Sequence, residues 1–167
     1  MTDGDFLRKL RERATHPPCS TEAVAMAEEQ LGFPLPPFLR YVYQNVADGG
    51  FGPGGGLFSV QRGHRSHREG CAGEGLVQVY EEVAVEPDWP RHLLPICDWG
   101  RATWSCLDCR SPEGQIVTSA GDAPLAVTGR DVRGWLLAWL DGVDLWAEMF
   151  EPMTSTGQGR PRGAPWA

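Results

Sequence analysis

A glycine-rich stretch, DGGFGPGGG at residues 48–56, carries a spacing known from phosphate-binding loops. Gly50, Gly52 and Gly55 match the pattern G-x-G-x-x-G, which cradles the pyrophosphate of a dinucleotide. That chemistry requires a loop that leaves a strand and enters a helix, because the helix N-terminus holds the phosphate. Here the pattern predicts the reverse order, with a helix ending near Val46 and a strand beginning at Leu57. We therefore predict that the stretch binds no phosphate.

The same stretch is better explained as a helix stop followed by a turn. Gly49 or Gly50 can take the left-handed conformation at the end of the preceding helix, and Gly52 and its neighbours allow a sharp reversal. Phe51 is then the one large apolar side chain in the loop, and we predict that it plugs into the core.

Cysteine and histidine supply the ligand types that zinc prefers. Cys106 and Cys109 form a C-x-x-C pair. The other candidate ligands are Cys71, Cys97, His64 and His67. The spacing to a second pair is irregular, however, and residues three apart on a strand face opposite sides of a sheet. We predict no metal or other cofactor, and a thiol-ligated zinc enzyme remains the alternative of another class.

Two serines could act as nucleophiles beside a histidine and a carboxylate. Ser105 and Ser66 are the candidates, with His64, His67 and His92 as bases. Neither serine lies in a G-x-S-x-G elbow, the turn that exposes such a nucleophile. The chain is therefore predicted not to be an enzyme.

Composition and charge narrow the class of partner. The 167 residues are enough for one domain, which we place at residues 1–152, with a flexible C-terminal tail at 153–167. No apolar run is long enough for a membrane span and no secretion signal is visible, so we expect a cytoplasmic protein whose five cysteines are free thiols. The net charge of −7 disfavours nucleic acid and suits a basic protein partner, although an acidic surface also serves solubility alone.

The elements that position these residues follow from periodicity and from stop signals. Helices are predicted at residues 5–15, at 20–31 with Ser20 as N-cap and Gly32 as stop, at 36–46, and at 76–83. Strands are predicted at 57–60, 92–99, 103–110, 114–120 and 124–129, with a tight turn joining the third and fourth of these. Asp131 is the N-cap of a last helix, whose apolar stripe runs through Trp135 and Trp139 to Val143, and Trp146 is placed on the same helix. Helices segregated from adjacent strands predict an α+β domain.

Read together and in order, three segments resemble the SUKH superfamily. They are LGFPLPPFLRYVYQNVADGGFGPG (31–54), LLPICDWGRATWSCLDCRSPEGQIV (93–117) and VRGWLLAWLDGVDLW (132–146). That group includes fungal cell-wall-assembly regulators and many bacterial immunity proteins, and the resemblance spans about residues 20 to 150. Relatives often carry Asn-Gly after the third helix, where this chain has Asp48-Gly49-Gly50.

The resemblance implies a curved, mainly antiparallel sheet flanked by helices, and it implies binding without catalysis. Many bacterial relatives neutralise a toxin, often a nuclease, by direct association, and an acidic protein complements a basic nuclease. A regulatory or scaffold module is the alternative within the same class. For either, the predicted contact surface lies in or beside the connecting loops, with acidic side chains for a basic partner and Trp99 as anchor. Its members are Asp48, Phe51, Asp98, Trp99, Arg101 and Asp108.

Overall fold

The computed structural model describes residues 2–61 and 75–150, and the account below is confined to them. The elements in chain order are α1 (Asp3–Arg13), α2 (Thr21–Leu31), α3 (Pro37–Asn45), α4 (Leu76–Val83), β1 (Leu93–Gly100), β2 (Thr103–Asp108), β3 (Gln115–Ala120), β4 (Ala126–Asp131), α5 (Val132–Leu140) and α6 (Leu145–Phe150). This is the predicted α+β class. The candidate residues His64, Ser66, His67 and Cys71, and the proposed tail at 153–167, lie outside the described residues. No helix among the described residues has the length and apolar character needed to cross a bilayer.

The predicted helix boundaries rest on capping interactions that the structure contains. The Ser20 hydroxyl accepts a hydrogen bond from the N–H of Ala23 at 3.1 Å, and Gly32 ends α2 in the left-handed conformation at φ = 78°. The Asp131 carboxylate accepts from the N–H of Gly134 at 2.6 Å, which starts α5. These three signals were read correctly because each acts within one helical turn.

The four strands form an antiparallel meander in the order β1-β2-β3-β4. The β2–β3 pairing is regular from Thr103 opposite Ala120 to Asp108 opposite Gln115, as the predicted hairpin requires. The β1–β2 pairing is irregular, with register shifts after Pro95 and after Asp98. Such irregularities bend a strand and re-aim its side chains, and here the second one lies at the end that carries Trp99.

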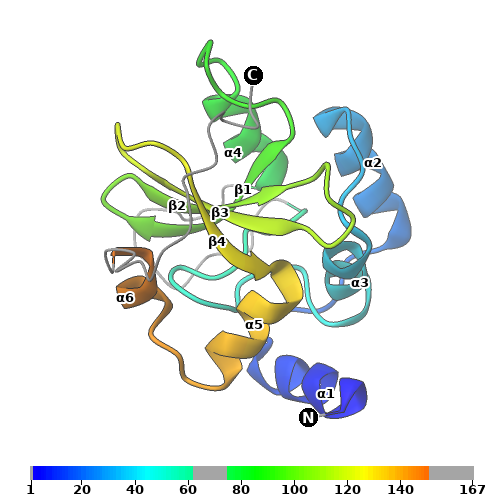
Figure 1. The fold of residues 1–167 in the computed structure, drawn as a ribbon. Coiled ribbons are helices and arrows are strands. Elements are labelled where there is room, and N and C mark those ends of the chain that lie inside the picture. The colour runs from blue at the N-terminus through cyan, green and yellow to red at the C-terminus, as the bar shows by residue number, and fades with distance from the viewer. Residues whose placement is uncertain (1, 62–74, 151–167) are drawn as a thin grey trace.

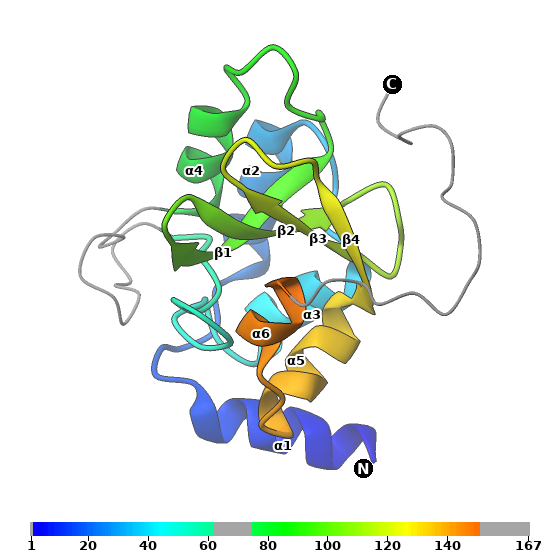
Figure 2. The same cartoon turned by 60° about the vertical axis from the view of Figure 1, so that its left-hand side comes forward.

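The two faces of the sheet are unequal. The inner face packs Leu94, Ile96, Leu107 and Ile116 into the main core, against α4 and α5, and Figure 2 shows α5 between the sheet and α1. The opposite face holds a small separate cluster of Leu93, Cys106 and Val117. Figure 1 shows that α6 follows α5 at the end of the sheet.

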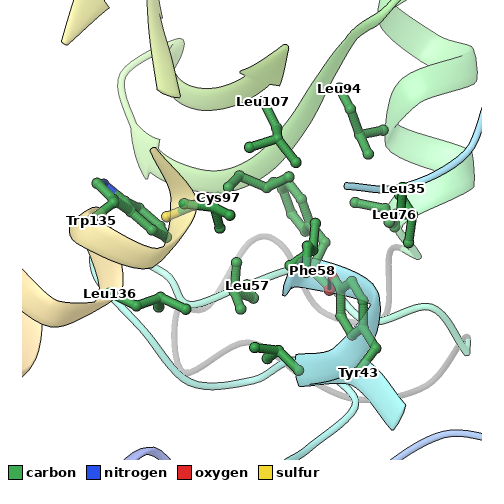
Figure 3. Close-up of a cluster of buried hydrophobic side chains, with 14 of the residues drawn as sticks. Leu35, Tyr43, Leu57, Phe58, Leu76, Leu94, Cys97, Leu107, Trp135 and Leu136 are labelled. Carbon is green, nitrogen blue, oxygen red and sulfur yellow. Dashed lines mark hydrogen bonds between the residues drawn. The ribbon is translucent and has the colours of Figure 1, made fainter. Parts of the chain in front are cut away.

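Residues 57–60 were predicted to be a strand, and this prediction was wrong. Leu57 and Ser59 make only isolated bridges, to Cys97 and Gly75. The segment passes between α3 and β1, where side chains and loop amides take the hydrogen bonds that a second strand would have made. Figure 3 shows side chains from α3, α4, α5 and the sheet converging around Leu57 and Phe58.

The last predicted helix is in fact two. The predicted apolar stripe extends to Val143, but α5 ends at Leu140 because Gly142 adopts φ = 78° and turns the chain. A separate six-residue helix, α6, follows, with the Asp144 carboxylate accepting from the N–H of Ala147 at 3.0 Å. Trp146 therefore does not share a helix with Trp135.

The position of Gly49 gives the first testable prediction. A Cβ at Gly49 would lie 2.7 Å from the carbonyl oxygen of Leu57 and 2.8 Å from the carbonyl carbon of Phe58, and φ is +71°. Gly49→Ala should therefore lower the free energy of unfolding by about 3 kcal/mol or more, measured by urea denaturation. Gly32→Ala is the matched control, because its φ of +78° is similar and no atom lies within 4 Å of the added Cβ. It should cost about 1–2 kcal/mol, and equal losses in the two variants would contradict the steric explanation.

Candidate functional site

Backbone amides of the glycine loop donate hydrogen bonds to carbonyl groups within the protein. The N–H of Gly50 donates to the carbonyl of Leu57 at 2.9 Å, and that of Gly55 donates to the carbonyl of Asp98 at 2.8 Å. A phosphate cradle needs such amides free and converging on one point. Gly49, Gly50 and Gly52 are all at positive φ, as the predicted turn requires. The predicted helix stop at Gly49 or Gly50 was wrong, because α3 already ends at Asn45 with Val46 as its C-cap.

Phe51 fills the core as predicted. Its side chain is 3% exposed, and its ring centroid lies 6.3 Å from that of Trp139 on α5. Trp139 is half-buried and Trp135 is buried, so the apolar stripe of α5 packs inward. Phe51 is therefore a structural residue, and its burial removes it from the predicted contact surface.

Asp48 is also buried, with 1% of its surface exposed. Its carboxylate accepts hydrogen bonds from the N–H of Val60 at 2.6 Å and from that of Gln61 at 3.1 Å. The sequence shows an acidic residue beside a glycine loop, which is typical of solvent exposure, and nothing in the pattern reveals the amides that it binds. Asp48 therefore does not belong to the predicted contact surface.

The cysteine pair diverges as the strand geometry predicts. Cys106 belongs to the small cluster on the outer face of the sheet, while Cys109 packs against the main core. Burial raises the pKa of both thiols, which disfavours the thiolate form that binds zinc. The described residues contain no group of three potential metal ligands. Because Cys71, His64 and His67 lie outside that part of the chain, the absence of a metal stays a prediction.

Ser105 is hydrogen-bonded to the indole of Trp99 and not to a histidine. Its hydroxyl oxygen accepts from Nε1 of Trp99 at 2.8 Å, and the residue is 1% exposed. His92 instead packs edge-on against the ring of Phe33, with centroids 5.2 Å apart. The described residues thus do not bring this serine and this histidine together as a nucleophile and base.

An aromatic cluster lies where the β1–β2 hairpin meets α6. The centroid of Trp99 is 5.9 Å from that of Trp146, which in turn is 4.8 Å from that of Phe150. Trp146 is 36% exposed and Phe150 is 50% exposed, whereas Trp99 is 9% exposed. A surface cleft of about 380 Å³ is lined by Trp99, Gly100, Arg101 and Trp146. We call Trp99, Arg101, Trp146 and Phe150 the aromatic patch.

The hairpin turn that presents Arg101 is strained. Gly100 pairs with Thr103, which leaves Arg101 and Ala102 as a two-residue loop, at φ = 55° and 54°. Such loops favour Asn-Gly or Gly-Gly, because a side chain at positive φ costs about 1–2 kcal/mol per residue. The Asp98 carboxylate holds the turn by accepting from the N–H of Gly100 at 2.6 Å. Asp98 thus supports the patch by shaping its turn.

Asp108 lies at the other end of β2, about 20 Å along the strand from Arg101. Burial works to raise the pKa of its carboxyl, but hydrogen bonds from Arg110 outweigh this effect and leave the pKa below its usual value. The six residues of the predicted contact surface therefore do not form one surface. Asp98, Trp99 and Arg101 are brought together, and the structure adds Trp146 and Phe150, which were not included.

A comparison with models of known protein families assigns the chain to one of them. The family model described as SMI1 / KNR4 family (SUKH-1) matches residues 18–137, which run from just before α2 into α5. The chain belongs to this family. The predicted SUKH resemblance is confirmed, and membership supports a role in protein interaction or immunity. No curated protein matches the chain.

The matched region covers the sheet but stops before α6. Within the aromatic patch, Trp99 and Arg101 thus lie on the part of the chain shared with the family, and Trp146 and Phe150 lie beyond it. A sequence signal for the latter exists in hindsight: two aromatic residues four positions apart follow a helix stop at Gly142, on a segment too short to bury both.

The strained turn predicts a stabilising substitution. Ala102→Gly should raise the free energy of unfolding by about 1 kcal/mol, because glycine adopts φ = 54° without steric cost. Ala84→Gly, at φ = −69° on the end of α4, is the control and should lower it by about 0.5–1 kcal/mol. Chemical denaturation of both variants checks the prediction, and a loss of stability in Ala102→Gly would contradict it.

Cys19 predicts a pH dependence of stability. Burial raises the pKa of its thiol from 9.0 to about 11, and the nearby Asp48 carboxylate adds to the effect. Between these values the unfolded thiol loses its proton while the folded thiol keeps it, so stability falls as pH rises from about 9 to 11. We expect Cys19→Ser to show a smaller fall in Tm over this interval than the wild type. Identical slopes would contradict the assignment, whatever the offset at pH 7.

Proposed function

We propose that this SUKH family member is a non-enzymatic immunity protein, which neutralises a cognate toxin by binding it directly through the aromatic patch. The observation that carries the proposal is the exposure of Trp146 and Phe150 beside a buried tryptophan and an arginine. Tryptophan and arginine are the residues most enriched among interface hot spots. Exposed aromatic side chains that contact one another on the surface of a folded protein mark a binding site more often than scattered ones do.

Contacts with buried residues hold Trp99 in place, and this gives the aromatic patch the rigidity that a hot spot needs. Trp99 is anchored from below by its hydrogen bond to Ser105, and Gly54 packs so closely on its ring that an added Cβ would lie 2.9 Å from it. Trp146 rests on this fixed ring. A partner that inserts an apolar group into the cleft therefore meets a surface that is already ordered, which lowers the entropic cost of binding.

Charge favours a basic partner. The chain carries a net charge of −7, and exposed acidic side chains precede α6 at Asp141 and Asp144. Opposite potentials speed encounter and disfavour partners of the wrong sign. A basic toxin domain, such as a nuclease, fits these features, with Arg101 available for one acidic or aromatic group on it.

The proposal is tested by co-expression with the toxin-like product of the neighbouring gene. Wild-type protein should restore growth and co-purify with the toxin. Trp146→Ala and Arg101→Glu should each weaken binding at least about 30-fold, the effect of losing a hot spot of about 2 kcal/mol, measured by calorimetry. Met26→Ala is the matched control, because Met26 is 61% exposed on α2, which lies apart from α6 in both views.

Two outcomes separate the parts of the proposal. If the wild type neither relieves killing nor co-purifies, the toxin assignment is wrong. If it does both and the two patch variants bind normally, the toxin assignment holds and the patch is wrong. Melting temperatures and circular dichroism of each variant show that the fold is intact, and Arg101→Glu changes an exposed side chain that α6 does not need.

A further inference from the structure

A second cavity lies under α6, on the inner face of the sheet. It has a volume of about 240 Å³, is lined by residues of β2, β3, β4, α5 and α6, and opens to solvent beside the exposed residues Val127 and Glu148. Its polar floor is made by Ser105 and Thr118, which stand directly opposite each other in the β2–β3 pairing. Both residues are buried, at 1% and 4% exposed. The cavity is separate from the surface cleft, since Trp99 lies between the two and contributes only to the cleft.

Thr118 is the unusual residue of this cavity. Its Oγ1 is buried and has no hydrogen-bond partner in the structure. A buried hydroxyl without a partner costs about 1–3 kcal/mol, so such groups are rare unless something outside the chain satisfies them. The neighbouring Ser105 oxygen accepts from Trp99 Nε1, which leaves its own hydrogen available to donate. The floor thus offers one O–H donor and one hydroxyl that can donate and accept.

The walls specify an apolar, uncharged ligand. Trp135, Leu145 and Met149 supply apolar surface, and a ring fits well against a tryptophan face and a thioether. The charged groups at the rim are Arg130 and Glu148, which satisfy each other through two hydrogen bonds of 3.1 and 2.8 Å. Because that pair is already neutralised, it selects neither an anion nor a cation.

We propose that this cavity binds a small neutral aromatic molecule with one hydroxyl group, of the size and chemistry of a phenol. The ring packs against Trp135 and Met149, and a rotation about the Cα–Cβ bond of Thr118 brings Oγ1 to the cavity surface in place of the methyl group. The ligand hydroxyl then donates to Thr118 Oγ1 and accepts from Ser105. A dry apolar cavity of about 150 Å³ holds a benzene ring, so the volume here accommodates a ring with one or two substituents. Ordered water is the competing occupant, because the floor is polar.

Phenol and toluene test the proposal, because they differ only by a hydroxyl in place of a methyl group. Each is titrated into the isotope-labelled protein, and binding is followed by NMR shifts of Leu145, Met149 and Thr118. Phenol should bind the wild type about five-fold more tightly than toluene, the ratio that one hydrogen bond of about 1 kcal/mol gives. Thr118→Val should abolish that preference without lowering Tm, since it removes a hydroxyl that has no partner.

Two further variants complete the design. Thr103→Val is the matched control, because Thr103 is equally buried at 4% exposed and lies on β2 outside the cavity; it should keep the phenol preference. Ala126→Leu adds three carbon atoms to the cavity wall from an exposed position and should weaken both probes. Unsaturable shifts with both probes in the wild type would show that the cavity binds no ring of this size, and a preference that persists in Thr118→Val would place the hydrogen bond to the ligand hydroxyl elsewhere. Either result overturns the proposal.

Discussion

Residues 57–61 pass through the interior without belonging to a helix or a strand. The fold depends on how the buried N–H and carbonyl groups of this segment find hydrogen-bond partners. Each N–H and carbonyl buried there needs a partner, because an unpaired one costs as much as a lost hydrogen bond. The hydroxyl of Tyr43 donates to the carbonyl of Phe58 at 2.7 Å, and the Asp48 carboxylate accepts from the amides of Val60 and Gln61. An α3 side chain and the carboxylate that follows α3 thus replace the strand that is missing on that side.

This arrangement joins the two halves of the molecule. The N–H of Phe58 donates to the carbonyl of Ile96 on β1 at 2.9 Å, and the amide of Gly50 donates to Leu57. The chain can come this close only because Gly49 has no Cβ. The glycine loop, α3 and β1 are therefore fixed relative to one another by these contacts. The inner face of the sheet then packs against α5. The positions of the aromatic patch and of the cavity under α6 both depend on this arrangement.

The sequence predicts well where the controlling interactions are local and poorly where they are not. The caps at Ser20 and Asp131 and the stop at Gly32 act within one turn, and the β2–β3 hairpin follows from alternation and a tight turn. The failures share another cause. The residues around Leu57 have the composition of a strand but lack a partner on one side, and Asp48 has the composition of a loop acid but binds amides twelve and thirteen positions away. No pattern within a short window carries either fact.

The candidate site shows the same limit. Trp99 and Arg101 could be selected from the sequence because they flank a turn, but Trp146 joins them only through the reversal at Gly142, which brings α6 back over the hairpin. The family match includes the hairpin and ends before α6. Of the aromatic patch, the matched part of the chain therefore supplies the buried Trp99 and the exposed Arg101, and the segment beyond the match supplies Trp146 and Phe150.

The helix α6 also links the two proposals physically. A six-residue helix has little stability of its own, because its nucleus costs more than its few hydrogen bonds return. It is held by the burial of Leu145, by the Arg130–Glu148 pair and by the packing of Trp146 on Trp99. One side of α6 closes the cavity through Leu145 and Met149, and the other presents Trp146 and Phe150 to a partner. A ligand in the cavity that orders α6 therefore lowers the entropic cost of binding a protein partner at the aromatic patch. By reciprocity, a bound partner raises the affinity of the cavity for its ligand by the same factor.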